Sequence, residues 1–376
     1  MKCLKLFLLG LIFCVHTVSS VQGQVYTNKE VGKKNEVHVD SIKNSVWPYS
    51  LPILGKKTTA KGYNLPLPAG INVQAFWQES DLIIENLMVG FNEGEMYDLD
   101  DIVRFDKAVA TAGAITFRPD IWLFPFLDIY GIFGYSNAST DVGFGVWIPD
   151  STNTPTEILS AESKVVFNAP TMGFGMTPTF GVAGLFIALD MNMTWTDVPQ
   201  LEKPARAFIF GPRVGKSFQF KKKDMNLAIW AGGFRVDMNS GTSGSVNLSD
   251  VLPVEDFGAK IDEGYQKLDD VQQQVDSWWE GLSPQEQLKP SNIARYEAAN
   301  AAISKAAEVM VTVENAFNDV ASSTVQYSMD KRPADKWNFI IGSQYQINKH
   351  FMVRAEAGFL GSRTQVTAGL QYRFGL

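Results

Sequence analysis

The chain has 376 residues, of which 45% are hydrophobic and 12% aromatic, and its mean hydropathy is −0.06. These values exclude a protein built mainly from transmembrane helices and leave room for one large domain or two ordinary ones. The formal net charge of −7 argues against a nucleic-acid partner. Both cysteines, Cys3 and Cys14, lie near the start, so the rest of the chain contains no disulfide.

The amino terminus has the order of a secretory signal peptide. Lys2 and Lys5 precede an apolar run from Leu6 to Val18, and small residues follow. The run is short for a membrane span, so we predict a signal peptide over 1–23 with cleavage after Gly23. A retained signal anchor is the alternative. Cleavage would remove two lysines and make the mature chain more acidic.

Residues 24–70 are polar and show no sustained hydrophobic period. We therefore expect an irregular, loosely ordered segment there. The alternative is a short motif that docks onto the rest of the protein or onto a partner.

The last forty residues alternate with period two, which is typical of strands. One face is apolar and rich in aromatic residues, and it comprises Trp337, Phe339, Ile341, Tyr345, Ile347, Phe351, Val353, Ala355, Ala357, Phe359, Val366, Ala368, Leu370, Tyr372 and Phe374. The other face carries polar and charged residues such as Gln344, Arg354, Glu356, Gln371 and Arg373. A soluble sandwich would bury the apolar face in a core, whereas a membrane barrel would turn it toward lipid.

Strand patterns also fill most of the region from Asn72 to Met238. The predicted strands are 72–91 (one long or two short), 109–117, 121–135 with a possible extension over 141–147, 165–176, 180–196, 207–220 and 227–238. Short turns are expected at 118–120, 177–179 and 221–224, and long loops at 92–106, 137–163 and 239–336. With the last three strands the total is ten, or twelve if the region around Asn72 adds a pair.

The pattern changes to helical periodicity over residues 251–326. Two heptad series are separated by Ser283-Pro284-Gln285-Glu286, which predicts a capping box with proline at the first helical position. Pro290 breaks the chain again, and Ser291 is a candidate cap for the next helix. We predict an antiparallel helical hairpin inserted between two strands.

Strand length, the alternation of tight turns with long loops, and aromatic residues near strand ends favour the membrane barrel over the soluble sandwich. The final strand ends Leu370-Gln371-Tyr372-Arg373-Phe374-Gly375-Leu376. In this it resembles Gram-negative bacterial outer-membrane β-barrel proteins, although that class typically ends on an aromatic residue and this chain ends on Leu376. The resemblance covers about residues 72–376 outside the helical insert.

The resemblance implies an all-β fold: an antiparallel transmembrane barrel of ten to twelve strands over residues 71–376, located in the bacterial outer membrane. It places the carboxyl terminus and residues 24–70 in the periplasm. The helical hairpin at 251–326 would then lie in an extracellular or lumen-facing loop. Outer-membrane lipid and the barrel-assembly machinery are the expected partners, with a small solute as a further possibility and no nucleic acid.

Nine side chains are candidates for lining the lumen, because they fall on the less apolar faces of predicted strands: Asp128, Asp190, Asn192, Arg213, Arg235, Asp237, Arg354, Glu356 and Arg373. One interpretation is a polar pore or ligand pocket of mixed charge. The other is a salt-bridged plug that fills a narrow barrel, because paired charges lower the cost of burying each other.

No motif in the sequence indicates an enzyme, and we predict no catalytic residues, no metal site and no cofactor. Only His38 and His350 remain after the signal peptide, and they lie in the irregular segment and at a turn. The patterns favour a porin-like channel or transporter for small or hydrophobic solutes.

The alternative function is a structural or surface-interaction barrel whose helical insert binds a partner. Trp278 and Trp279 are the candidate partner contacts, since aromatic residues anchor many interfaces. Equally, one tryptophan could pack in the seam of the hairpin and the other at the membrane or barrel rim.

Overall fold

A computed structural model describes residues 36–182, 184–198, 201, 203–222, 224–238, 241–251, 254–319 and 323–376. The strands are β1 (Ala69–Phe91), β2 (Tyr97–Asp98), β3 (Val103–Phe124), β4 (Leu127–Pro149), β5 (Pro155–Val182), β6 (Leu185–Thr196), β7 (Ala205–Gln219), β8 (Asn226–Met238), β9 (Gly241–Asn247), β10 (Thr324–Pro333), β11 (Trp337–Gln346), β12 (Phe351–Phe359) and β13 (Arg363–Phe374). The helices are α2 (Glu36–Lys43), α3 (Gly55–Thr59), α4 (Leu248–Val251), α5 (Val254–Glu280), α6 (Pro284–Gln287) and α7 (Pro290–Asn318). The predicted signal peptide lies outside the described residues.

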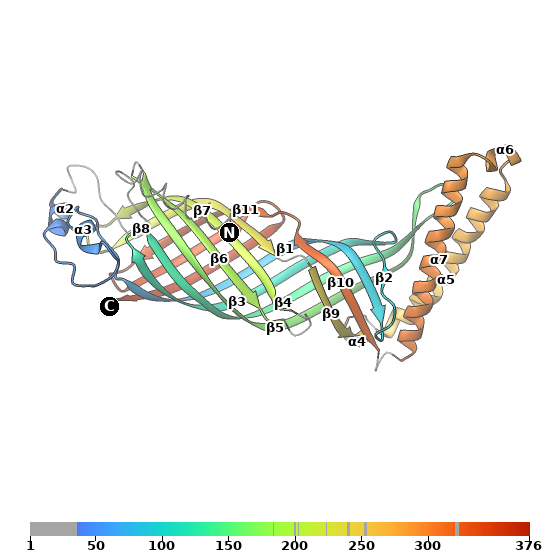
Figure 1. Cartoon of the computed structure of the whole chain (residues 1–376), viewed down its shortest axis with the longest axis horizontal. Coiled ribbons are helices and arrows are strands. Elements are labelled where there is room, and N and C mark those ends of the chain that lie inside the picture. Colours follow the sequence, from blue (N-terminus) through green and yellow to red (C-terminus); the bar gives the residue numbers. More distant parts are fainter. Residues whose placement is uncertain are drawn as a thin grey trace, which may run out of the picture.

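Ten strands form a closed antiparallel barrel (Figure 1). They follow one another in the order β1, β3, β4, β5, β6, β7, β8, β11, β12 and β13, and β13 pairs back with β1. That closing ladder runs from Ala69 opposite Phe374 to Ser80 opposite Arg363. Closure leaves no unpaired edge in the wall, which a membrane-spanning sheet requires.

The faces of the wall are inverted relative to a soluble protein. In β11, Trp337, Phe339 and Ile341 are 44%, 38% and 45% exposed on the outside, whereas Asn338 and Gln344 point inward and are 5% and 1% exposed. The same outward apolar face continues around the barrel through Ile115, Phe117, Phe133, Tyr135, Val166, Met172, Phe174, Val214, Ile229, Val353, Val366 and Leu370. An apolar outside around a polar inside is the arrangement of a barrel in lipid, and the predicted face assignment of the last three strands is confirmed.

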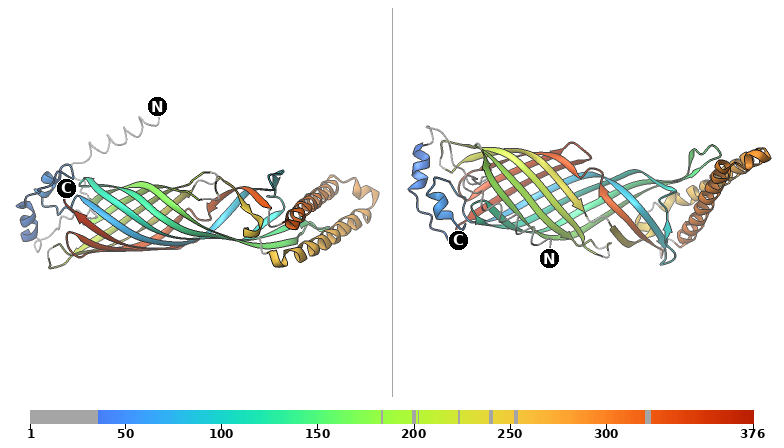
Figure 2. Two further views of the ribbon diagram at one scale, coloured as in Figure 1. Left: turned by 90° about the horizontal axis from the view of Figure 1, so that it is seen from below. Right: turned by 45° about the horizontal axis from the view of Figure 1, so that its top comes forward.

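Four strands are much longer than the barrel needs. β1, β3, β4 and β5 have 23, 22, 23 and 28 residues, whereas β12 has 9. A tilted membrane strand needs only about 9–11 residues. The surplus forms an extension sheet beyond the barrel (Figure 2). In this sheet β1 pairs with β10 instead of β13 from Leu82 onward, and β9 pairs with β10.

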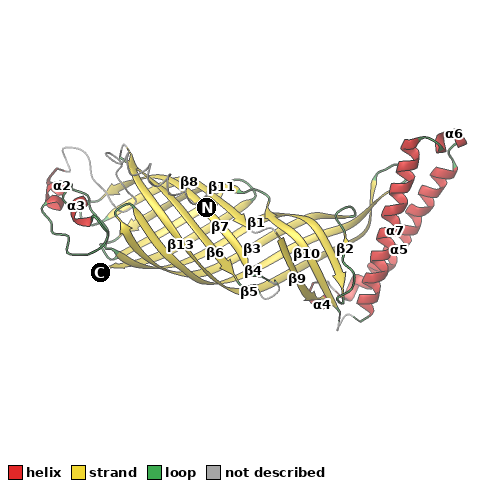
Figure 3. Cartoon of the chain, viewed as in Figure 1, coloured by secondary structure: helices red, strands yellow, loops and turns green. Residues whose placement is uncertain are grey.

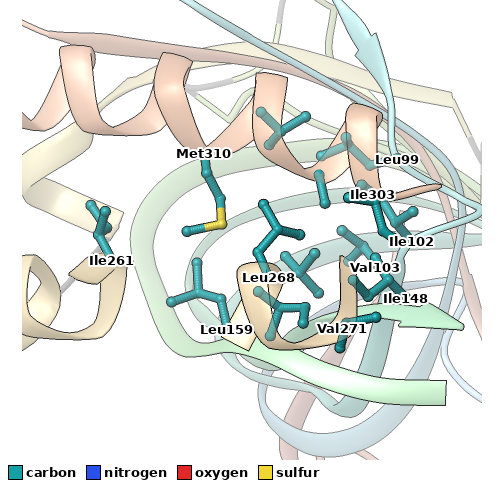
Figure 4. Packing of buried hydrophobic residues seen from close by; sticks show 14 of the residues in the cluster. Leu99, Ile102, Val103, Ile148, Leu159, Ile261, Leu268, Val271, Ile303 and Met310 are labelled. Carbon is teal, nitrogen blue, oxygen red and sulfur yellow. The ribbon is translucent and has the colours of Figure 1, made fainter. Parts of the chain in front are cut away.

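The helices lie at the two ends of this elongated molecule (Figure 3). The end that carries the carboxyl terminus, the short turns and helices α2 and α3 is called the turn end below. The opposite end, called the extension end, carries the extension sheet and the hairpin of α5 and α7. The sheet and hairpin share one hydrophobic core, in which Ile102, Ile148, Val271, Ile303 and Met310 are 0–6% exposed (Figure 4).

The predicted capping box at the tip of the hairpin is present. The Ser283 hydroxyl accepts a hydrogen bond from the Glu286 amide, and the Glu286 carboxylate accepts from the Ser283 amide. Hydrogen bonding to Ser283 holds the pKa of Glu286 below its ordinary value. The next helix begins differently from our expectation, because Lys289 and not Ser291 is its N-cap, with Pro290 as the first helical residue.

Two predicted turns are wrong because each was placed at a proline that lies inside a strand. Arg118–Asp120 and Thr177–Thr179 lie inside β3 and β5, and the turns come later, at 125–126 and around Gly184. We took Pro119 and Pro178 as turn signals, but both side chains lie within paired strands of the wall. The possible extension over 141–147 does belong to β4, whereas the predicted long loop at 137–163 is almost entirely strand, in β4 and β5.

The boundaries of the helical insert also differ. Residues 324–326 begin β10, and β9 precedes the helices, so the hairpin is flanked by two strands that the sequence did not suggest.

Truncation of the hairpin core should loosen the extension without affecting the barrel. Met310→Ala removes a side chain that is 2% exposed, and a cavity of this kind costs about 2–5 kcal/mol. We expect faster hydrogen exchange in α5 and α7 and unchanged heat-modifiable migration of the barrel on unboiled gels. Val311→Ala, at the neighbouring position that is 49% exposed, should leave exchange unchanged, and equal effects of the two substitutions would contradict this core.

Candidate functional site in the barrel lumen

Seven of the nine predicted lumen residues face the interior of the barrel, and they fall into two groups. Asp190, Asn192, Arg213, Arg354 and Glu356 meet near mid-barrel. Asp128 and Arg373 lie together near the turn end, beside Asp120. The sequence therefore identified most of the charged interior but not its division into two groups.

The mid-barrel group is centred on a buried ion pair. The Arg213 guanidinium on β7 donates to both carboxylate oxygens of Glu356 on β12, at 2.7 and 2.9 Å. The two side chains are 6% and 5% exposed, and Trp230 on β8 donates its indole N–H to the same carboxylate at 2.7 Å. Since Gly342 has no side chain, the Trp230 ring can lie against β11, where a Cβ would come within 2.5 Å of it.

Further polar contacts widen this group across the lumen. Arg213 Nη1 lies 3.2 Å from an Asp190 oxygen, and the Tyr130 hydroxyl donates to the other oxygen of that carboxylate. Arg354 lies 3.5 Å from Glu356 and places its guanidinium 4.8 Å from the centre of the Trp230 ring. Charges that are paired and hydrogen-bonded in this way can be retained in a dry interior.

The second group ties the wall to the amino-terminal segment. Arg373 is fully buried, and it pairs with Asp120 at 2.8 Å and donates from Nε to the backbone carbonyl of Leu67 at 2.9 Å. Gln371 donates to the same Asp120 carboxylate at 2.8 Å. An ion pair inside the wall therefore also binds a segment that is not part of the wall.

That segment closes the turn end of the barrel. Tyr63, Leu65 and Leu67 are 5–6% exposed. The Ile53 amide donates a hydrogen bond to the Leu123 carbonyl of β3, and the Trp122 amide of β3 donates to the Pro68 carbonyl. We call residues 36–68 the cap. The expectation of an irregular segment is wrong for this part of the chain, because it contains α2 and α3 and docks onto the barrel through buried side chains and backbone hydrogen bonds.

On the side formed by β7, β8 and β11, the lumen toward the extension end is apolar, whereas β13 places the buried polar residues Arg363 and Gln365 there. Phe234, Val236 and Ile340 form a buried cluster on β8 and β11, with Ile209 of β7 against it. The described interior thus contains the Arg373 group, the Arg213 group and this apolar cluster, with the cap at the turn end. It also holds the buried polar residues Asn338, Arg363 and Gln365 and a second apolar cluster at Phe186, Ala188 and Ala228. This arrangement corresponds to the plug interpretation of the charged residues.

Arg235 and Asp237 do not face the lumen. On β8 the buried positions are Phe234 and Val236, so the residues between and after them point outward. Arg235 lies opposite Phe210 of β7 and Asp237 opposite Phe208, both on the outer face. We had assigned the less apolar face of β8 to the interior, but Phe234 and Val236 take the inward positions of this strand and its charges lie outside.

The two hairpin tryptophans are packed within the hairpin itself. Trp279 stacks on Tyr296 of α7 with ring centres 4.5 Å apart, and Arg295 places its guanidinium 4.3 Å from the Trp278 ring. This matches the interpretation that a tryptophan packs in the seam, and it makes both residues poor candidates for direct partner contacts.

Sequence analysis missed Asp120, Tyr130 and Trp230 of the lumen groups, and also Arg118, whose guanidinium lies 5.8 Å from the centre of the Tyr130 ring. Arg118 and Asp120 were assigned to a turn because Pro119 separates them. Their signal was present, since Thr116, Arg118, Asp120 and Trp122 keep the inward period of β3 through the proline. Tyr130 and Trp230 were taken as apolar residues, although each carries a hydrogen-bond donor that a polar interior can use.

No protein-family model matches the sequence, and no curated protein matches it. Among solved structures, the β domain of the Bordetella autotransporter BrkA is similar, with 9% identity, a TM-score of 0.33 and coverage of 82% of this chain and 100% of that chain. An outer-membrane channel from Pseudomonas putida F1 has 8% identity, a TM-score of 0.28 and coverage of 83% and 97%. A Pseudomonas aeruginosa FadL homologue has 8% identity, a TM-score of 0.26 and coverage of 94% and 100%.

The chain is a transmembrane β-barrel. Its own geometry carries that conclusion, through the closed ten-stranded wall, the outward apolar belt and the charged interior.

In the part of the chain that the structure describes, no helix is both long and apolar enough to cross a membrane.

Breaking the mid-barrel pair should destabilise the whole wall. Glu356→Ala leaves Arg213 and Arg354 without their shared carboxylate, and an uncompensated buried charge costs about 3–5 kcal/mol. We expect a clear fall in the temperature at which the folded band disappears on unboiled gels. Asp237→Ala, which breaks the outward-facing pair with Arg235, is the matched control and should shift it little; an unchanged temperature for Glu356→Ala would contradict the network.

Proposed function

We propose that this chain is a surface-interaction barrel: a plugged anchor in the outer membrane that holds the α5–α7 hairpin outside the cell to bind a partner. The observation that carries the proposal is the continuity of β1, β3, β4 and β5 from the barrel wall into the extension sheet. The extension end faces outward in this proposal, with the cap in the periplasm.

The hairpin is fixed rigidly to this scaffold. α5 packs on β5 and α7 on β4, and Tyr265 of α5 donates a hydrogen bond to Glu314 of α7 at 2.8 Å. Burial and that hydrogen bond raise the pKa of Tyr265 to about 12, so the tyrosine remains a donor at physiological pH. A helix pair held through a shared core can present a surface in one orientation, which lowers the entropic cost of binding.

The exposed face of α5 indicates the chemistry of the partner. Asp262, Glu263, Asp269 and Asp270 are exposed, and their spacing of seven residues places them on one side of the helix. Lys267 is the only basic residue between them, so the face is strongly acidic. We propose that the partner offers a basic surface, since complementary charge guides association and selects the partner.

Photo-crosslinking on intact cells tests this function. A photoreactive amino acid at exposed Gln273 should yield an adduct with the partner, and adding Asp269→Lys and Asp270→Lys should abolish the adduct by reversing the local charge. Thr152, which is exposed in the β4–β5 loop and is not part of the acidic face of α5, provides the control position. An adduct that survives the charge reversal, or no adduct at Gln273, would count against the acidic face.

The second candidate is a gated channel or transporter for small or hydrophobic solutes. The cap favours it, because residues 36–68 lie at the turn end without being part of the hydrogen-bonded wall, so the wall does not need the cap to close. Channels among the similar structures, such as the Pseudomonas putida protein, are compatible with this candidate but do not argue for it at such low similarity.

Liposome swelling distinguishes the two candidates. If the chain is an anchor, a variant lacking residues 47–66 should remain as impermeable to small sugars as the intact protein, because the Arg213 group and the apolar cluster still fill the lumen. Rapid swelling with the shortened variant, on a background of normal heat-modifiable migration, would instead support the channel.

A further inference from the structure

A cluster of cations lies on the lipid-facing surface near the extension end of the barrel. It consists of Arg235 on β8, which the sequence had suggested for the lumen, and Lys336, the residue before β11. On the neighbouring strand β7, Arg206 is exposed on the same outward face as Phe208 and Phe210. Neither the plugged lumen nor the acidic hairpin gives these residues a role.

The charges in this cluster do not balance. Arg235 binds Asp237 through two contacts of 2.8 and 3.2 Å, and Lys336 reaches the same carboxylate at 3.7 Å. Two cations therefore share one anion. The side chains of Arg235, Asp237 and Lys336 are 38%, 33% and 56% exposed, so the excess positive charge is accessible from the membrane side.

Aromatic side chains surround the cations. The Trp337 ring lies flat against β8 because Gly233 has no side chain there, and a Cβ would come within 2.9 Å of the ring. Phe210 packs edge-to-face on Trp337 with ring centres 6.1 Å apart, and the Arg235 guanidinium lies 5.9 Å from the Trp337 ring. Toward the turn end the outer face continues with the apolar residues Val214, Ile229 and Ile341.

The position of the cluster fixes its depth in the bilayer. Arginine or lysine on the lipid face is costly at the bilayer midplane and nearly free of cost near the interface. Aromatic residues also gather at the interface. The cluster therefore lies at headgroup level, with the apolar belt beside it in the acyl region.

We infer that this surface binds a phosphorylated, multiply acylated glycolipid of the outer leaflet. Arg235 and Lys336 donate to the phosphate oxygens, since guanidinium and ammonium groups form charge-assisted hydrogen bonds with phosphate. The acyl chains lie along Phe210, Val214 and Ile341. The inference rests on the proposed outward orientation of the extension end, but the binding itself can be measured without reference to the hairpin.

Native mass spectrometry of the refolded full chain in detergent tests the inference. The probes are lipid A carrying two phosphates, the same lipid after removal of its phosphates, and phosphatidylcholine. The wild-type protein should retain phosphorylated lipid A and neither of the other two. The double variant Arg235→Gln, Lys336→Gln should lose at least about tenfold in retained lipid A, since tenfold corresponds to about 1.4 kcal/mol and each lost charge-assisted contact exceeds that.

Lys216→Gln is the matched control, because Lys216 is an exposed outward cation on β7 but lies toward the turn end. It should retain lipid A as the wild type does. Heat-modifiable migration of every variant confirms that the barrel is folded. Equal retention of the phosphorylated and dephosphorylated lipids, or undiminished retention by the double variant, would overturn the inference whether or not the hairpin binds a partner.

Discussion

The ladder between β1 and β13 is the interaction on which the rest of the structure depends. It joins residues nearly three hundred positions apart in sequence, from Ala69 opposite Phe374 to Ser80 opposite Arg363. Once it forms, the sheet has an inside and an outside, and every side chain in the wall is committed to one of them by the period of two. The lipid-facing belt and the charged interior are both consequences of this closure.

A closed wall of ten strands encloses a narrow interior, and the chain fills it with ion pairs instead of an apolar core. The reason lies in the opposite face, which must be apolar to lie in lipid and which the strands use their large hydrophobic residues to build. The inward positions then carry polar groups that satisfy one another, as Arg213, Glu356 and Trp230 do. Apolar inward clusters interrupt this polar lining, at Phe234 and Ile340 toward the extension end and at Phe186 and Ala228 toward the turn end.

The sequence was most informative where the alternation was uninterrupted. The faces of β11, β12 and β13 were predicted residue by residue, and the ten strands of the barrel were counted correctly.

Prediction failed where a local signal in the sequence conflicted with pairing to a distant strand. Pro119 and Pro178 look like turns until β1 and β4 pair with them, and β9 and β10 have little pattern of their own because they exist as additions to the edge of β1. The outward orientation of Arg235 depends on Phe234 and Val236 packing against Ile340 of β11 in the lumen, which the sequence of β8 alone does not reveal. The docking of the cap likewise depends on Arg373 binding a backbone carbonyl, and a carbonyl has no sequence signature.

The continuity of β1 also has a mechanical consequence. Its amino-terminal half forms hydrogen bonds with β13 and its carboxyl-terminal half with β10. One strand therefore belongs to both the barrel seam and the extension sheet. A force applied to the hairpin along the long axis of the molecule would pass down β1 and load the hydrogen bonds of the seam together, in shear, and not one after another. If a partner pulled on the hairpin, the resistance would thus come from the membrane-embedded wall, and the β1–β13 seam that closes the barrel would also bear the tension.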